Sequence, residues 1–479
     1  MRQTMILMAV FLALSPPLQA QDATADLGPA LTKQYDDGSI YEGTFLNGLQ
    51  HGQGSYRMPS GYVYQGNWIE GRIEGAGVAR YPNGSVYTGA FVAGQPHGQG
   101  KITYADGGSY EGAWIEGRIE GEGLAIYPDG ARYQGGFVGG LRQGKGRMTA
   151  ADGAIYDGDW QGGLLQGRAR IEEPDGTVYE GDVVAGLREG QGIYTTTDGM
   201  RHEGAWRAGQ INGPGKMSLP NGDTYEGDFK EGRRNGRGVI VYAGGGRYEG
   251  EVKADLRHGQ GVFKAADGGS YDGQWVEGRM EGHGRLTYPD GSVYEGNFLA
   301  DKPDGSGRMT WPDGASYEGT WDAGVMQGEG RATFADGASY EGPFRAGRPE
   351  GRGVMVRPDG TRHEGLFRAG VAHGRGKVTY PDGASYSGMF RDGQRHGMGQ
   401  MTAADGTVYS GEWAAGLPQG RGIARYPGGD AYEGSFVAGQ REGQGVLRYK
   451  SGKVASGMWK AGTLVAPGLE AAAGLATPG

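Results

Sequence analysis

Cysteine is absent from this 479-residue chain, which excludes disulfides, thiolate metal sites, cysteine nucleophiles and a lipid anchor carried on cysteine. Lysine and arginine nowhere form a block and the formal net charge is −9, so nucleic acid is excluded as a partner. Aliphatic residues are too sparse for a conventional globular core, because only 37% of the residues are hydrophobic while 102 are glycine. Such a composition is typical either of disorder or of a repeat with glycine at set positions.

Long apolar runs are also lacking, and no stretch reaches the roughly eighteen residues that a membrane span requires. The longest run, Met5–Leu14, follows Arg2 and precedes Pro16 and Pro17, and the small residue Ala20 comes soon after. This order predicts a secretory signal peptide over residues 1–20 and an exported chain, periplasmic or secreted and associated with the cell envelope. An uncleaved anchor is the alternative. Residues 21–34 are expected to form a linker.

What the sequence does have is an unbroken period. The register of Tyr41-Glu42-Gly43 occurs 19 times at steps of 23 residues, without insertion or deletion, the last copy being incomplete. Counting that tyrosine as position 1, tyrosine occupies position 1 in 16 registers, glycine occupies position 3 in all 19, and an aromatic residue occupies position 5 in 17. A disordered low-complexity chain would not keep phase in this way, so ordered repeats are predicted over residues 35–462.

Each unit predicts one β-hairpin. Positions 1, 3 and 5 are Tyr, Gly and aromatic with polar residues between them, and positions 14, 16 and 18 alternate in the same way, as at Gly284, Leu286 and Tyr288. A glycine-bounded loop such as residues 71–75 is expected within each hairpin, and Pro-Asp-Gly predicts the turn to the next hairpin. Consecutive strands must then be antiparallel neighbours. The predicted fold is all-β: an elongated, twisted, single-layer antiparallel sheet of tandem hairpins.

The spacing Y-E-G-x-(F/W)-x-x-G-x-x-x-G-x-G, repeated about eighteen times, resembles the MORN (membrane occupation and recognition nexus) repeat. The resemblance covers nearly all of the chain that follows the linker. It implies a non-catalytic, elongated single-layer sheet that serves as a scaffold, forms dimers, or contacts membranes and partner proteins.

The aromatic residues form the candidate interaction face. Their rings are expected to lie flat over the bare backbone of the glycines, and the alternatives are a core role alone or a core role together with a groove for a partner. The predicted interaction residues are Tyr41, Phe45, Tyr64, Trp68, Tyr87, Phe91, Tyr110, Trp114, Tyr133, Phe137, Tyr156 and Trp160. The glycines predicted to be structural are Gly43, Gly66, Gly89 and Gly112.

The opposite face and the hairpin ends offer other surfaces. Position 2 is Asp or Glu in 13 registers and Lys or Arg is frequent at position 15, which predicts cross-strand ion pairs on a solvated face. The wider loops carry lone apolar residues that are expected to form exposed tips touching a membrane or a partner: Ile73, Ile119, Leu164, Met280 and Met326. Each terminal strand leaves an edge that a second copy could pair with, which predicts a homodimer or an end-to-end assembly.

Catalytic, cofactor and metal sites are not expected. The histidines fall in separate repeats, so they are interpreted as structural rather than as zinc ligands. Residues 139–145 fit G-x-x-x-x-G-K, but Gly146 stands where a phosphate loop needs Ser or Thr. Departures from the pattern, among them Ala169, Asp255 and Asp301, are taken as drift.

The sequence therefore predicts a non-enzymatic, exported scaffold that binds a protein or peptide along its aromatic face. Peripheral binding to a membrane or cell envelope through loop tips is the alternative, and glycan chemistry on the tryptophans is the weakest hypothesis. Residues 463–479, rich in Ala, Gly and Pro, are expected to be a flexible tail.

Overall fold

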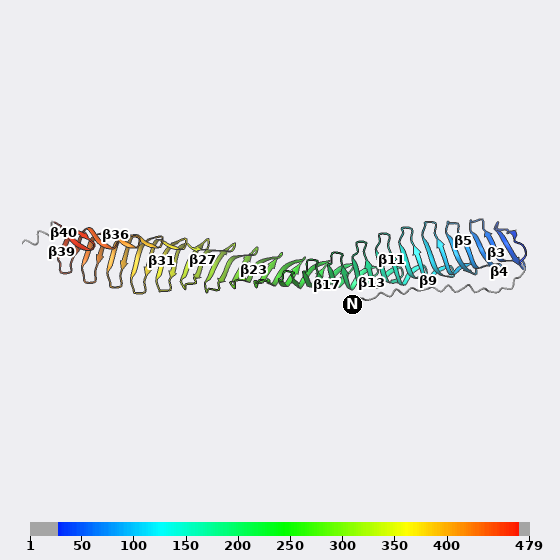
Figure 1. Cartoon of the computed structure of the whole chain (residues 1–479), viewed down its shortest axis with the longest axis horizontal. Coiled ribbons are helices and arrows are strands. Elements are labelled where there is room, and N and C mark those ends of the chain that lie inside the picture. The colour runs from blue at the N-terminus through cyan, green and yellow to red at the C-terminus, as the bar shows by residue number, and fades with distance from the viewer. Residues whose placement is uncertain (1–26, 469–479) are drawn as a thin grey trace, which may run out of the picture. The chain divides into compact units, whose positions relative to one another are not determined.

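The computed structural model of the chain describes residues 27–468 and divides into two units, unit 1 up to Gln210 and unit 2 from Ile211. The described residues form 40 β-strands and no α-helix. Within each unit every strand pairs antiparallel with its neighbours in the chain, as the sequence predicts, and Figure 1 shows these hairpins side by side in chain order. The strands β29 and β30 are two parts of one strand, and both pair with β28.

The strands of unit 1 are β1 (Leu31–Gln34), β2 (Ile40–Leu46), β3 (Leu49–Arg57), β4 (Val63–Ile69), β5 (Arg72–Arg80), β6 (Val86–Val92), β7 (Gln95–Thr103), β8 (Ser109–Ile115), β9 (Arg118–Ile126), β10 (Arg132–Val138), β11 (Leu141–Thr149), β12 (Ile155–Gln161), β13 (Leu164–Glu172), β14 (Val178–Val184), β15 (Leu187–Thr195) and β16 (Arg201–Arg207). The strand β17 (Gln210–Ser218) begins at the last residue of unit 1.

The remaining strands of unit 2 are β18 (Thr224–Lys230), β19 (Arg233–Val241), β20 (Arg247–Lys253), β21 (Leu256–Lys264), β22 (Ser270–Val276), β23 (Arg279–Thr287), β24 (Val293–Leu299), β25 (Lys302–Thr310), β26 (Ser316–Asp322), β27 (Val325–Thr333), β28 (Ser339–Arg345), β29 (Arg348–Pro349), β30 (Gly351–Val356), β31 (Arg362–Arg368), β32 (Val371–Thr379), β33 (Ser385–Arg391), β34 (Gln394–Thr402), β35 (Val408–Ala414), β36 (Leu417–Arg425), β37 (Ala431–Val437), β38 (Gln440–Arg448), β39 (Val454–Lys460) and β40 (Thr463–Pro467).

Two boundaries differ from the sequence expectation. The strand β1 lies in the range expected to be a linker, because residues 31–34 take the register of a second hairpin strand and pair with β2. The strand β40 lies in the range expected to be a tail. The predicted signal peptide and residues 469–479 lie outside the described residues.

The prediction of a five-residue loop within each hairpin is wrong. In place of a five-residue loop at residues 71–75, the chain makes a two-residue turn at Glu70 and Gly71, with φ of 48° and 81°. Two residues with positive φ define the turn type whose twist matches a hairpin. A β-bulge follows: Gly66 pairs with Gly77 while Trp68 pairs with Ile73, so one residue of β4 opposes three of β5. The bulge absorbs the residues that look like a loop in the sequence.

The predicted turns between hairpins are confirmed. In a representative copy, Tyr127 N donates to Ala131 O at 2.8 Å and Gly130 N donates to Tyr127 O at 3.0 Å. The carboxylate of Asp129 also accepts a hydrogen bond from Ala131 N at 2.9 Å, while Gly130 takes a positive φ of 91°. Asp and Gly are therefore present for turn geometry.

Glycines at positions 3 and 14 form one row across the strands of each unit. Gly66 pairs with Gly54 on one side and with Gly77 on the other, and this pairing recurs from repeat to repeat. A tyrosine lies directly on the row: a Cβ added to Gly238 would sit 2.6 Å from Tyr225 Oη. The predicted stacking on glycine is thus present for tyrosine, on what we call the ring face, whereas the Phe or Trp at position 5 packs against tyrosine rings.

Tyrosine hydroxyls at position 1 are satisfied locally in every repeat but that of Tyr156. Tyr225 Oη donates to Asp228 O, the carbonyl at position 4, at 2.9 Å, and Tyr64 Oη donates to Asn67 O at 3.1 Å. Burial raises the pKa of Tyr225 to about 12, so the hydroxyl remains a neutral donor. Buried tyrosines can thus replace aliphatic side chains in a sheet that has no second layer above it.

One repeat departs from the pattern and shows what the glycine does. Ala169 stands at position 14, and its Cβ lies where the ring of Tyr156 would sit. Tyr156 is only half-buried, and neither a ring pair nor a hydroxyl hydrogen bond is observed for it, whereas Tyr133 in the preceding repeat is fully buried and makes both. A single methyl group thus displaces the ring, so Ala169 is more than drift.

We expect Gly238→Val to lower stability by roughly 2 kcal/mol or more, because the new side chain overlaps the Tyr225 ring. The melting temperature followed by circular dichroism measures this. Gly244→Ala is the matched control in the same repeat, since a Cβ there would have no neighbour within 4 Å. Equal melting temperatures for the two variants would contradict the ring-on-glycine contact.

Candidate interaction surface

The predicted aromatic residues lie together on the ring face and are mostly buried there. Tyr41, Tyr64 and Tyr87 are 0% exposed, and Trp68 is 5% exposed. Tyr110, Tyr133, Phe91, Phe137, Trp114 and Trp160 are also buried, whereas Phe45 and Tyr156 are half-buried. The rings therefore form the core of the sheet, and their predicted role in binding a partner stays a prediction.

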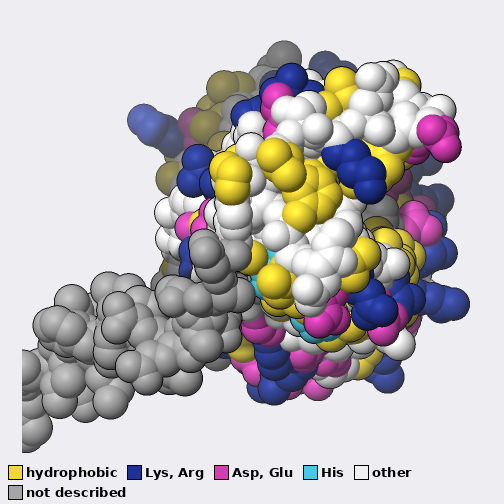
Figure 2. Space-filling view, turned by 90° about the vertical axis from the view of Figure 1, so that its right-hand side faces the viewer, with side chains coloured by type: hydrophobic (Ala, Val, Ile, Leu, Met, Phe, Trp, Pro, Cys, Tyr) yellow, Lys and Arg dark blue, Asp and Glu magenta, His cyan; other side chains and the backbone are white. Residues whose placement is uncertain are grey.

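The rings stack edge to face along each unit. Tyr64 contacts Trp68 of its own repeat at 5.7 Å between centroids and Phe91 of the next repeat at 5.0 Å. Such pairs contribute about 0.5–1.5 kcal/mol beyond burial alone. Tyr110 and Phe137 also line a hollow of about 310 Å³, where part of the ring face stays open to solvent. Figure 2, which looks onto the end where unit 1 begins, shows hydrophobic side chains in the middle and charged ones around them.

The predicted structural glycines Gly43, Gly66, Gly89 and Gly112 all lie in the glycine row. A Cβ at Gly112 would sit 2.5 Å from Tyr110 Oη and 2.6 Å from the Cα of Gly123. Neither the ring nor the paired backbone leaves room for a larger residue there.

The opposite face, which we call the polar face, carries a groove in unit 2 with a volume of about 1070 Å³. Its floor is the glycine row between Gly296 and Gly353. One wall consists of side chains at positions 2 and 15, namely Glu295, Arg308, Glu318, Arg331, Glu341, Val354 and Glu364. The other wall consists of side chains at positions 4 and 13, namely His283, Asn297, Ser306, Thr320, Glu329 and Arg352. We call this feature the polar groove.

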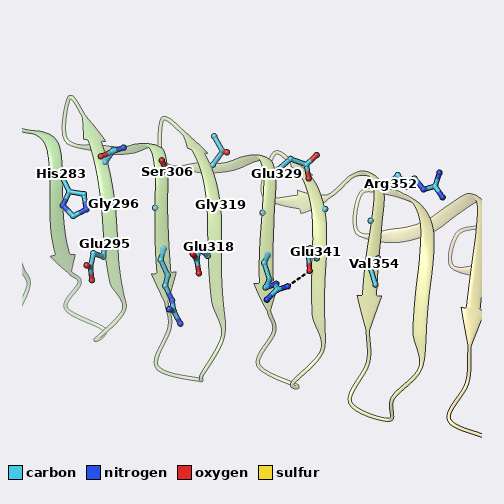
Figure 3. Close-up of a pocket in the computed structure, with 18 of the residues that line it drawn as sticks. His283, Glu295, Gly296, Ser306, Glu318, Gly319, Glu329, Glu341, Arg352 and Val354 are labelled. Atoms are coloured by element: carbon cyan, nitrogen blue, oxygen red, sulfur yellow. Dashed lines mark hydrogen bonds and ion pairs between the residues drawn. The ribbon is translucent and has the colours of Figure 1, made fainter.

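Figure 3 shows Glu295, Glu318 and Glu341 at the same level on successive hairpins. The predicted cross-strand ion pairs are present: Arg331 lies 2.6 Å from Glu341, and Arg285 lies 3.5 Å from Glu295. The hydrogen bond that Arg331 donates to Glu341 raises the pKa of Arg331, and the hydrogen bond that Arg362 donates to Glu364 lowers the pKa of Glu364. Because these side chains are more than 40% exposed, each pair adds little to stability. The groove therefore presents formed charges to solvent.

Exposed apolar side chains lie beside the two-residue turns. Of the five loop residues that the sequence suggests, only Leu164 is exposed. Ile73, Ile119, Met280 and Met326 are half-buried, because the bulge places position 10 opposite the aromatic ring at position 5. The exposed residues are those at positions 6 and 9, directly before and after the turn. In unit 1 they form a row that we call the turn edge: Leu49, Ile69, Val92, Ile115, Val138, Leu141, Leu164, Val184 and Leu187.

Histidines at position 11 help to hold the turns. His51 Nδ1 accepts a hydrogen bond from Glu70 N at 3.4 Å, and His97 Nδ1 accepts one from Glu116 N at 3.5 Å. Glu74, at the same position, accepts from Ala93 N at 3.0 Å. In residues 27–468 no three potential metal-ligating side chains come together. Position 11 therefore supplies a hydrogen-bond acceptor to the turn of the next repeat.

Two other departures have structural roles. Asp255 and Asp301 replace the turn glycine at position 8 with φ of 73° and 69°. The carboxylate of Asp255 accepts hydrogen bonds from the backbone and side chain of Arg234 in the preceding repeat. Asp301 similarly accepts from Met280 N at 2.8 Å. These contacts between repeats compensate for the unfavourable backbone angles, so the two residues are not drift.

His202 and His363 replace the tyrosine at position 1. His363 is 9% exposed, and its ring lies 4.6 Å from Phe390 and 5.0 Å from Phe367. Burial, with a smaller contribution from Arg357, lowers the pKa of His363 to about 4. In the unfolded chain the pKa of His363 is near 6.5. Between pH 6.5 and 4 the unfolded state therefore binds more protons than the folded state, and stability decreases as the pH is lowered.

We expect His363→Tyr to reduce this loss on acidification, since a tyrosine is neutral and its hydroxyl reaches the carbonyl at position 4 in other repeats. The loss removed is at most about 3 kcal/mol. The measurement is the difference in melting temperature between pH 7.5 and pH 4.5. His97→Gln serves as the control because glutamine occupies the same position in other repeats. If the melting temperature falls equally between the two pH values in His363→Tyr and in the unchanged chain, the lowered pKa of His363 is refuted.

Fold and surfaces together define a tandem β-hairpin repeat protein. The model of the MORN repeat matches eighteen consecutive segments, from residues 41–61 to residues 432–454, and the chain belongs to this family. The described residues include no helix with the length and apolar character needed to cross a membrane.

Other similarities are limited. Alsin of Rattus norvegicus is 44% identical over 50 residues, which is 9% of this chain and 3% of that protein. The TCP domain of SAS-4 from Drosophila melanogaster, solved with a proline-rich motif of Ana2, covers 33% of this chain and 86% of that domain at 16% identity with a TM-score of 0.22. Virginiamycin B lyase of Staphylococcus aureus covers 74% of this chain and 93% of the lyase at 10% identity with a TM-score of 0.11. TM-scores this low do not indicate a shared overall fold.

Proposed function

We propose that this chain is a non-enzymatic scaffold that docks a polypeptide partner in the polar groove of unit 2. The observation that carries the proposal is the groove itself, which is accessible, whereas the aromatic rings are committed to the core. Charges of both signs line it with carboxylates in excess, which suits a polypeptide that carries exposed cations. Five carboxylates and three guanidinium groups line the groove, and this excess of negative charge repels a nucleic acid backbone. Export of the chain, and pairing with a second copy, stay predictions from the sequence.

A photo-crosslinking residue placed at Thr320 in the full chain tests this function in the source cells. Thr320 lines the groove, and Ala113 occupies the same position 4 in unit 1, outside it. We expect a discrete polypeptide adduct at Thr320 that is absent at Ala113, because a docked partner lies within reach of the groove wall on which Thr320 stands. Adducts of equal yield at the two positions, or none at Thr320, would overturn the proposal.

Peripheral binding to a membrane is a second proposal, supported by the turn edge of unit 1. Its nine aliphatic side chains are each about half exposed and recur along one edge of the sheet. An exposed apolar row of this kind is uncommon on a soluble protein without a binding role. The acidic net charge predicts that neutral lipid is preferred over anionic lipid.

Flotation with phosphatidylcholine vesicles tests the second proposal. We expect the full chain to float and the double variant Val138→Asp with Leu141→Asp to lose at least half of the floated fraction, because two carboxylates replace exposed aliphatic groups. Gln161→Asp is the matched control, since residue 161 lies in the same row and is already polar. No flotation of the unchanged chain, or equal flotation of both variants, would exclude membrane contact by this edge.

A further inference from the structure

The polar groove has a chemical repeat along its length. Glu295, Glu318, Glu341 and Glu364 all occupy position 2 and lie on β24, β26, β28 and β31, with one paired strand between each two. Paired strands are about 4.8 Å apart, so equivalent carboxylates recur about every 9.6 Å along the groove. A ligand that uses more than one of them must present matching groups at this interval.

The groove is also narrow. Its two walls stand on positions 2 and 4 of the same strand, two residues apart with glycine between them, as at Glu318 and Thr320. Two residues of a β-strand span about 7 Å. An α-helix with its side chains measures about 10–12 Å across and does not fit between the walls. The bound segment must therefore be extended.

Two extended conformations can be compared with the spacing of the carboxylates, and only one matches every interval. Side chains on the same side of a β-strand recur about every 6.7 Å, so a β-strand can meet only every second carboxylate. A polyproline II helix has three residues per turn with a rise of about 3.1 Å, so its equivalent side chains recur about every 9.3 Å. Over the three intervals between Glu295 and Glu364 the mismatch is only about 1 Å, which long side chains absorb.

The backbone of the groove offers a second set of contacts. In three other repeats a carboxylate at position 4 accepts a hydrogen bond from the amide at position 13: Asp182 from Gln191, Glu251 from Gln260, and Glu412 from Arg421. In the groove position 4 is Asn297, Thr320 or Pro343, and in the described residues no side chain accepts from the amides of Ser306, Glu329 or Arg352. A polyproline II segment, whose carbonyls make no internal hydrogen bonds, supplies acceptors.

We propose that the polar groove binds a polypeptide in the polyproline II conformation that carries Lys or Arg at every third residue. The cations pair with Glu318 and share Glu295, Glu341 and Glu364 with Arg285, Arg331 and Arg362, whose ion pairs are exposed. The intervening small or proline residues lie over the glycine floor. This inference rests on the proposed docking function and specifies the conformation and charge spacing of the partner.

Binding of synthetic peptides to the full chain tests the spacing. One peptide is (Pro-Pro-Lys) repeated five times, and the other has the same composition with its lysines grouped at one end. We expect the in-phase peptide to bind about fivefold more tightly in low salt by isothermal titration, because only it aligns several exposed ion pairs at once. The difference should shrink in about 0.5 M salt as the charges are screened.

Variants locate the site. Glu318→Gln with Glu341→Gln should remove the preference for the in-phase peptide, and both residues are exposed, so the fold is expected to stay intact. Glu42→Gln with Glu111→Gln changes position 2 in unit 1, outside the groove, and should leave the preference unchanged. Circular dichroism verifies that both peptides adopt polyproline II.

Equal affinity for the two peptides, or a preference that survives Glu318→Gln with Glu341→Gln, would overturn the inference. Its failure is distinct from failure of the docking function. An adduct at Thr320 without any preference between the peptides means that a polypeptide of another conformation occupies the groove. If neither an adduct at Thr320 nor a preference between the peptides is found, the docking function is refuted as well.

Discussion

The structure depends on one contact, a tyrosine ring lying on the backbone of two paired glycines. A sheet without a second layer has to cover its apolar face with its own side chains. The glycines at positions 3 and 14 leave space against the backbone, and the ring fills it, with the hydroxyl bound to a carbonyl of the same strand. The aromatic residue at position 5 then packs against the tyrosines of its own and the preceding repeat. All of these contacts join immediate neighbours, so stability is expected to be a sum of local terms.

Variation within the repeat shows where this contact is strict. Ala169 adds one methyl group to the glycine row, and Tyr156 loses its full burial, its ring pairs and its hydroxyl bond. His363 keeps the ring contacts but gives up the hydroxyl, and its pKa falls because the ring stays buried. Asp255 can replace a turn glycine because it gains Arg234 as a partner. Each exception has consequences that reach only to the adjacent repeat.

The polar groove follows from the same arrangement. Since the ring face uses positions 1, 3 and 5, the alternation of a strand sends positions 2 and 4 to the other side. Glycine between them leaves a floor without side chains, and strict phase aligns identical groups on successive hairpins. Charges that lie 23 residues apart in the chain become neighbours along a line. A repeat that folds by covering one face thereby produces an ordered array on the other.

The sequence by itself determined the elements: the unbroken period, the alternation of Tyr, Gly and Phe or Trp, and the Pro-Asp-Gly turns define antiparallel hairpins, because each of these signals is local and recurs in phase. It also identified which aromatic residues and glycines lie on one face. Only the tertiary structure showed that Glu70 and Gly71 form a two-residue turn followed by a bulge. That bulge decides the rest: it turns Ile73 inward against Trp68, leaves positions 6 and 9 exposed, and so selects the surfaces that remain for a partner. Strand alternation can be read from a sequence, but the number of residues that a bulge absorbs depends on how the two strands pair.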